Sequence, residues 1–302
     1  MIESKTAIVF SGGGARGAYS AGVALAFKQC QRYPGIVSGT SAGALIAAMV
    51  VNGEEERLVE IWKHLTPQQV YRKRRTLNFL LSFVSNYVYP GFSAEPLAEL
   101  IRKHVDVNKI RQNPRHLLVT CYNQTLQQVE RFDNHSDSLH TVLQASTALP
   151  IIFSPVWMNG HEYVDMGATD VPLKPVVAIG AEKIYVVLSD HPDDYRRPIR
   201  NNLDWAVNIM HLAQRDSVLL DIELARRTNL VTNGTGYRFL DVTIILPSRS
   251  LGLGFLDFHK RHHIHKAIEL GLEDGLRVLK QTSMDRPAPQ EKLAGQITPH
   301  LS

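Results

Sequence analysis

The chain of 302 residues carries a formal net charge of +4, a pI near 9.0, 44% hydrophobic residues and two cysteines. This length suits one large α/β domain or two smaller ones, and the charge is too small to predict a nucleic-acid partner without a motif. Cys30 and Cys121 form no disulfide framework and no metal-ligand spacing, which fits a reducing compartment. The longest apolar run, residues 42–51, is about half as long as a membrane-spanning helix, and the apolar run near residue 8 is too short for a signal peptide. We therefore expect a cytoplasmic, globular protein.

A glycine-rich loop follows the first predicted strand, Thr6 to Phe10, and precedes a helix predicted over Ala18 to Gln29. The sequence of residues 11–17 is Ser-Gly-Gly-Gly-Ala-Arg-Gly. The backbone N–H groups of such a loop, together with the positive end of the following helix, form an anion site. The anion is either a phosphate or the oxyanion of a tetrahedral intermediate. The loop lacks the second half of G-x-G-x-x-G and the lysine-serine ending of a Walker A loop.

A second glycine motif, Gly39-Thr40-Ser41-Ala42-Gly43, has the G-x-S-x-G pattern of a nucleophile elbow. It lies between a short β-leaning segment, residues 36–38, and an apolar helix predicted over residues 42–51. Such a turn holds its serine in a strained conformation that presents the hydroxyl group. The elbow follows the first loop closely, which favours the oxyanion role for that loop.

A basic cluster, Arg72, Lys73, Arg74 and Arg75, directly precedes the apolar or amphipathic segment 76–84 and two tyrosines. This combination fits a peripheral contact with an anionic membrane surface, such as the inner surface of the cell membrane. The alternative is a solvated loop beside an ordinary core helix.

The middle of the chain alternates between helices and strands. A helix is predicted over 54–65, another begins at an N-cap at Ser93, and a third covers 139–148, while strands are predicted over 117–121 and 128–132.

Asp165 is a candidate functional residue at the end of a strand. Asn159-Gly160 is a hairpin-turn signal, so Tyr163-Val164 should form a strand that ends at Asp165. Catalytic groups of parallel-sheet proteins collect at strand ends. The alternative is a turn aspartate that hydrogen-bonds its own backbone.

The last third continues the alternation. Strands are predicted over 181–189 and 239–246, and helices over 204–230 and 266–279. We expect one domain over residues 1–281 and a loosely ordered tail over residues 282–302, which is rich in proline and polar residues. The alternation predicts an α/β fold with a central, mostly parallel sheet and helices on both faces.

Three motifs in this order resemble those of the patatin-like phospholipase family. They are Gly-Gly-Gly-Ala-Arg-Gly at residues 12–17, Gly-Thr-Ser-Ala-Gly at 39–43 and Asp-Met-Gly at 165–167. The segments 144–150 and 171–175 are similar to those that bracket the family's aspartate. The resemblance implies the family's three-layer α/β/α architecture and extends over roughly residues 5–280 in the order of its elements.

The resemblance also implies a serine-aspartate dyad without histidine, formed by Ser41 and Asp165. Asp165 would take the proton from Ser41 as its oxygen attacks an ester carbonyl, and water would later release the acyl group. An aspartate, with a pKa of about 3.9, is a weak base for an alcohol, so the site must compensate. The oxyanion would be held by backbone N–H groups of the glycine loop, namely those of Gly12, Gly13, Gly14, Ala15 and Arg16. Four further glycines would support the elbow and the motifs: Gly17, Gly39, Gly43 and Gly167. Arg16 either fixes this loop or meets a lipid phosphate, or it forms a structural ion pair.

Met166 departs from the family pattern, because a glycine usually follows the aspartate. The stretch from there to Pro172 is also one residue shorter than the common pattern. Gly167 is the residue that would take over the glycine's role. This departure is compatible with three outcomes: an altered substrate preference, reduced activity, or lipid binding without turnover.

The leading interpretation is a serine acyl hydrolase that cleaves carboxylic esters of phospholipids, lysophospholipids or acylglycerols, without metal or cofactor. Transfer of the acyl group to an alcohol other than water is chemically close to hydrolysis, so an acyltransferase is an alternative. A second interpretation is an esterase with a triad of Ser41, Asp165 and either His191 or His211. A third is a non-catalytic protein that binds a lipid or a phosphate in the glycine loop.

Overall fold

The fold is built on a sheet whose five consecutive strands are parallel. The structure, a computed structural model, describes residues 1–73, 91–165, 173–195, 202–230 and 239–284. In these residues the main sheet has eight strands in the order β10-β9-β1-β2-β5-β8-β7, with β6 also paired to β5. The parallel strands are β1 (Ile2–Phe10), β2 (Tyr33–Gly39), β5 (His116–Asn123), β9 (Lys183–Val187) and β10 (Asp241–Ile245).

The remaining strands pair antiparallel. They are β6 (Gln128–Asp133), β7 (Val156–Met158) and β8 (His161–Val164) in the main sheet, and the separate pair β3 (Arg72–Lys73) and β4 (Phe92–Ser93). The predicted hairpin turn is confirmed, since Asn159 and Gly160 join β7 to β8 with φ of 52° and 79°. Both residue types tolerate this left-handed conformation.

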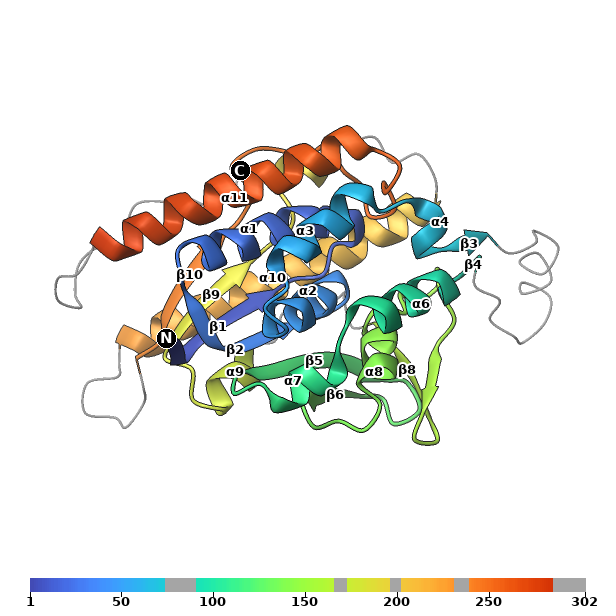
Figure 1. Ribbon diagram of the computed structural model, residues 1–302, viewed down its shortest axis with the longest axis horizontal. Helices are drawn as coiled ribbons and strands as arrows, with labels where there is room; N and C mark the ends of the chain where they lie inside the picture. Colours follow the sequence, from blue (N-terminus) through green and yellow to red (C-terminus); the bar gives the residue numbers. More distant parts are fainter. Residues whose placement is uncertain (74–90, 166–172, 196–201, 231–238, 285–302) are drawn as a thin grey trace.

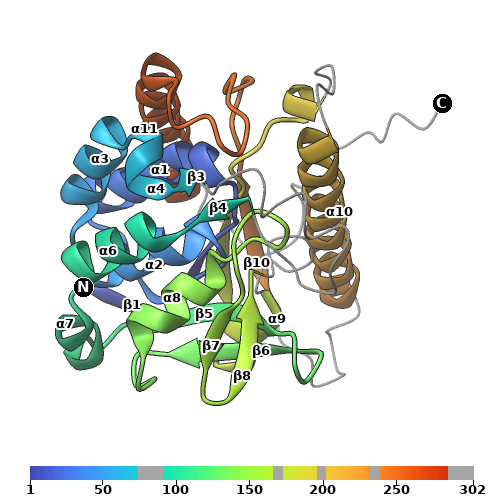
Figure 2. The same ribbon diagram turned by 90° about the vertical axis from the view of Figure 1, so that its right-hand side faces the viewer.

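Helices cover both faces of the sheet. α1 (Gly17–Gln29), α2 (Ala42–Val51), α3 (Glu55–His64) and α11 (Arg261–Met284) lie on one side, and α9 (Leu173–Ala178) and α10 (Asn202–Leu230) lie on the other (Figures 1 and 2). Alternate residues of each strand point to opposite layers, as the period of two requires. Phe10 and Tyr185 belong to the first layer's core, and Val9 and Val186 pack with residues of α9 and α10. The predicted α/β/α architecture is therefore confirmed.

Four further helices and two turns of 3-10 helix complete the described part of the chain. They are α4 (Pro67–Val70), α6 (Glu95–His104), α7 (Val107–Gln112), α8 (Leu139–Ser146), η1 (Gly14–Arg16) and η2 (Pro192–Tyr195). α8 packs on β5 and α6 packs on α8, which places both near the antiparallel end of the sheet. Within the described residues, no helix combines the length and hydropathy needed to cross a bilayer.

Two of the differences between predicted and observed boundaries concern α6 and α11. The N-cap of α6 is Ala94, one residue after the predicted Ser93, whose hydroxyl oxygen instead accepts a hydrogen bond from Glu95 N at 3.3 Å. α11 continues to Met284, past the boundary expected at residue 281, and residues 285–302 lie outside the described part. In the added turn, the Thr282 hydroxyl donates to the helix carbonyls of Val278 and Leu279 at 3.1 Å.

Asp274 on α11 joins three segments inside the first layer. Its Oδ2 accepts hydrogen bonds from Tyr19 Oη on α1 at 3.2 Å and from Ser248 N at 2.9 Å, and its Oδ1 accepts one from Arg277 at 2.6 Å. Burial, followed by the charge of Asp274, raises the pKa of Tyr19 well above its ordinary value. Tyr19 therefore stays a neutral donor to the carboxylate.

We predict that Asp274→Ala lowers the free energy of unfolding by about 1–3 kcal/mol, because the buried Tyr19 hydroxyl and the Ser248 N–H lose their acceptor. Urea denaturation measures this loss. Glu273→Ala is the matched control, because the neighbouring carboxylate is 64% exposed and meets Arg249 only at 3.7 Å. Equal losses in the two variants would contradict the structural role of Asp274.

Candidate active site

Ser41 occupies a sharp turn between β2 and α2. Its φ of 59° and ψ of −131° lie outside the conformations that a non-glycine residue usually adopts. Gly39 and Gly43 allow the turn to close, since a methyl group on either would come within 2.3 Å of a backbone oxygen. This strained strand-to-helix turn is the geometry that the G-x-S-x-G pattern predicts.

The backbone N–H of Ser41 is held by Ser146 in the last turn of α8. The distance from Ser41 N to Ser146 Oγ is 3.0 Å, and the Ser146 hydroxyl donates in turn to Thr120 O at 2.9 Å. All three residues are buried. The elbow is thereby tied to α8 and β5. Sequence reasoning missed Ser146, although it lies in the segment 144–150 that resembles the family.

Asp165 is anchored at the same end of α8. It follows β8 directly, and its N–H donates to Ala148 O at 2.9 Å. Its residue surface is 4% exposed, against 3% for Ser41. Burial, and next the charge of Asp165, raise the pKa of the Cys121 thiol well above its ordinary value. The structure thus brings Ser41 and Asp165 to one buried region, through Ser146 and Ala148.

The glycine loop lies beside the elbow. A methyl group on Gly12 would lie 3.0 Å from Ser41 Cβ and 3.7 Å from Ser41 Oγ. Gly12 O accepts a hydrogen bond from Ser189 Oγ at 2.7 Å, at the end of β9. Gly14 has a φ of 55°, and an added methyl group there would meet Phe255 O at 2.3 Å. The loop is therefore fixed between β9 and the segment that contains Phe255.

Two of the five predicted oxyanion donors have other partners. The N–H of Ala15 donates to Phe255 O at 2.8 Å, and the N–H of Arg16 donates to Gly13 O at 3.1 Å. The candidate donors are therefore narrowed to the N–H groups of Gly12, Gly13 and Gly14. Arg16 is buried, which fits a role in fixing the loop better than a contact with lipid.

Helix ends add to the electrostatics of the site. α2 begins immediately after Ser41, and α1 begins immediately after the 3-10 turn of the glycine loop. Both helices therefore direct their positive ends toward the region of the elbow, where they favour negative charge. An alkoxide or oxyanion beside Ser41 gains from this arrangement. No group of three or more His, Cys, Asp or Glu side chains suited to a metal occurs in the described ranges.

The other predicted residues have local contacts of their own, are exposed, or lie outside the described residues. Nδ1 of His191 accepts a hydrogen bond from Asp193 N at 3.2 Å, within its own turn. Arg72 and Lys73 are exposed on β3. The remaining predicted positions lie outside the described residues. They are the side chain of His211 and the residues Arg74, Arg75, Met166 and Gly167.

An apolar pocket begins at the residue after the elbow serine. It has a volume of about 80 Å³ and lies between α2, α3 and α6, with walls that include Ala42, Leu45, Ile61, Trp62, Leu97 and Ile101. Sequence reasoning gave no position for this pocket, because its walls come from three separate helices.

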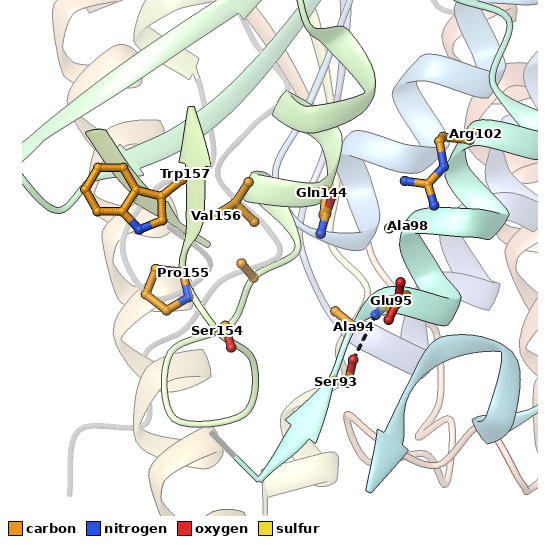
Figure 3. A pocket seen from close by; sticks show the side chains of 11 residues that line it. Ser93, Ala94, Glu95, Ala98, Arg102, Gln144, Ser154, Pro155, Val156 and Trp157 are labelled. Carbon is orange, nitrogen blue, oxygen red and sulfur yellow. Dashed lines mark hydrogen bonds between the residues drawn. The ribbon is translucent and has the colours of Figure 1, made fainter. Parts of the chain in front are cut away.

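A polar pocket lies on the other side of α6 (Figure 3). Its volume is about 320 Å³, and Glu95, Arg102, Gln144 and Trp157 line it together with Ala148, whose carbonyl holds Asp165. α6 thus separates a polar pocket from an apolar one.

The sheet with helices on both faces and the strained serine turn define an α/β/α protein with a nucleophile elbow. The patatin-like phospholipase family model matches residues 8–177, more than half of the 302 residues. The chain belongs to this family of lipid hydrolases.

The solved structure of VipD agrees with the fold, and ExoU is a more distant match. VipD from Legionella pneumophila superposes with a TM-score of 0.51 at 15% identity, covering 92% of this chain and 67% of VipD. The type III effector ExoU of Pseudomonas aeruginosa gives a TM-score of 0.43 at 12% identity, covering 93% of this chain and 53% of ExoU. At these identities the likeness to VipD concerns the fold alone.

We predict that Ser146→Ala lowers the free energy of unfolding by about 1–3 kcal/mol, because the buried N–H of Ser41 loses its acceptor. Chemical denaturation measures the change. Ser20→Ala is the matched control, since the Ser20 hydroxyl is buried without a hydrogen-bond partner among the described residues. We expect no loss of stability in this control, and a Ser146 variant as stable as the wild type would contradict the role of Ser146 in the elbow.

Proposed function

We propose that the chain hydrolyses carboxylic esters of lipids, either phospholipids, lysophospholipids or acylglycerols, with Ser41 as nucleophile and Asp165 as base. The observation that carries the proposal is the joint attachment of both residues to the end of α8. Ser41 N is 3.0 Å from Ser146 Oγ, and Asp165 N is 2.9 Å from Ala148 O.

The proposed reaction has two steps. Asp165 accepts the hydroxyl proton while Ser41 Oγ attacks the carbonyl carbon, and the N–H groups of Gly12, Gly13 and Gly14 stabilise the oxyanion. The intermediate collapses to an acyl-enzyme as the alcohol leaves with the proton. Water then attacks the acyl group while Asp165 takes a proton from it. The second intermediate collapses as Asp165 returns this proton to Ser41 Oγ, which releases the fatty acid and restores the free serine.

The environment of the dyad supports this chemistry. Hydrogen bonds and charge interactions are stronger in a site shielded from water, and Ser41 and Asp165 are both buried. The elbow conformation is maintained by the fold before substrate arrives, so the nucleophile needs little reorganisation. Both effects compensate for the weak basicity of a carboxylate.

The apolar pocket supports an acyl chain as the group next to the nucleophile. It starts at Ala42 and is lined almost entirely by aliphatic and aromatic side chains. Its volume of about 80 Å³ is smaller than the roughly 150 Å³ cavity that holds benzene in another protein. A longer chain therefore requires movement of half-buried side chains such as Leu45 and Ile61.

We predict that Ser41→Ala and Asp165→Asn each lower kcat for p-nitrophenyl esters by about 10³-fold or more, because each removes a group needed for the chemical step. Steady-state kinetics with acyl chains of increasing length measures the loss. A serine-directed phosphonate should label the wild type and not Ser41→Ala.

The controls for this experiment are His191→Ala and, separately, His211→Ala, each of which should keep the wild-type rate if the dyad acts without histidine. Loss of turnover in either variant would favour the triad instead. A folded wild type that hydrolyses no ester and resists the phosphonate would contradict the proposal and favour the binding protein. Adding a long-chain alcohol distinguishes acyl transfer, because transfer yields a new ester.

We also predict that Leu45→Trp lowers kcat/KM for long-chain esters about tenfold relative to short-chain esters, because the indole fills the pocket one helical turn after Ser41. The chain-length profile measures this change. Leu25→Trp is the matched control, since Leu25 is also half-buried on a helix but does not line the pocket. The same shift in both variants would show that the pocket does not bind the chain.

A further inference from the structure

An apolar turn, residues 149–153, leaves α8 directly beyond the backbone that anchors Asp165. The N–H groups of Ile152 and Phe153 donate to Leu149 O at 3.2 and 2.9 Å, and all three of these residues are buried. Ile151 lies between them with 57% of its surface exposed. The turn is thus fixed by buried neighbours and presents one large aliphatic side chain to the outside. The chain continues from it through Ser154 and Pro155 to β7 (Figure 3).

The conformation of Ile151 is costly. Its φ is 73°, in the left-handed region that glycine and asparagine tolerate and β-branched residues rarely adopt. An asparagine would fit this backbone with less strain and would leave no aliphatic group in water. Packing among the described residues does not explain the isoleucine, which indicates a contact beyond them for its exposed side chain.

Two cations lie next to this turn. The N–H of Phe92 on β4 donates to Ile152 O at 3.2 Å. In the β3–β4 pair, Phe92 lies opposite Lys73, and Arg72 lies opposite Ser93. Arg72 and Lys73 are both exposed. An exposed aliphatic group and two positive charges therefore share one part of the surface.

This part of the surface adjoins the candidate active site. The turn begins one residue after Ala148, which holds Asp165, and its buried residues pack against Phe255, which holds the glycine loop. Ser41 is 3% exposed, so a lipid must leave a bilayer and enter the protein before it reacts. A surface that adjoins the site and rests on the membrane would give the lipid a short path to Ser41.

We propose that Arg72, Lys73 and Ile151 form a docking surface for a bilayer that contains anionic lipids. The proposal rests on the proposed function. Ile151 inserts among the acyl chains, and the two cations face lipid phosphates, which is the division of roles found in interfacial anchors. The charge of Arg72 and Lys73 favours an anionic lipid surface over an uncharged protein partner as the occupant.

Sedimentation with vesicles of phosphatidylcholine and phosphatidylglycerol tests this surface. Ile151→Asn should weaken the binding of the full chain about tenfold, because an aliphatic side chain no longer leaves water. Arg72→Gln combined with Lys73→Gln should weaken it at least tenfold at low salt and less at high salt. Ile151→Asn should unfold at the wild-type temperature or above it, since asparagine accepts the left-handed backbone. If that variant is unstable, Ile151→Gly replaces it in the same assay.

Two matched controls make the same kinds of change toward the opposite end of the parallel strands. Ile179→Asn removes an isoleucine that is 47% exposed and precedes β9, and Lys5→Gln with Lys183→Gln removes one charge from β1 and one from the start of β9. Both controls should bind vesicles like the wild type. Wild-type protein that does not sediment with anionic vesicles, or Ile151 variants that bind as tightly as it does, would overturn the proposal. Vesicle binding needs no turnover, so its failure is distinguishable from failure of the ester hydrolase.

Discussion

The hydrogen bond from Ser41 N to Ser146 Oγ is the interaction on which the site depends. It joins residues 105 positions apart in the chain and ties the strained elbow to α8 and, through Thr120, to β5. A left-handed serine is stable only where its surroundings determine its conformation. The same end of α8 receives the N–H of Asp165, so one helix terminus positions both members of the proposed dyad.

The glycine loop depends on a different part of the chain. Its carbonyl at Gly12 is held by Ser189, and its amide at Ala15 is held by Phe255. The segment that contains Phe255 is itself fixed by Asp257, whose Oδ2 accepts from Gly254 N at 2.7 Å and from Lys260 at 2.6 Å. All of these partners lie beyond residue 177, where the match to the family model ends. The C-terminal part of the chain thus completes a site whose motifs lie in the N-terminal part.

α6 separates two chemically different surroundings beside the site. One face of this helix, with Leu97 and Ile101, lines the apolar pocket, and another face, with Ala98 and Arg102, lines the polar one. The helical period of 3.6 residues produces this division from adjacent positions in the sequence. A lipid ester also combines an apolar chain with a polar head, which agrees with membership of a family of lipid hydrolases.

The sequence alone determined the alternation of the principal strands and helices, the elbow at Ser41, the hairpin that leads to Asp165 and the family. These features depend on local patterns. The patterns are the period of the hydrophobic residues, glycines at positions where two backbone segments come close together, and turn residues such as Asn159-Gly160. Only the tertiary structure decided that Ser146 and Ala148 hold the two candidate catalytic residues, and that the amides of Ala15 and Arg16 have other partners. It also decided where the apolar pocket lies and that Ile151 stands beside the cations of β3. These contacts join segments that are far apart in the chain. A local sequence pattern does not predict them, because it carries no information about which distant group accepts or donates a given hydrogen bond.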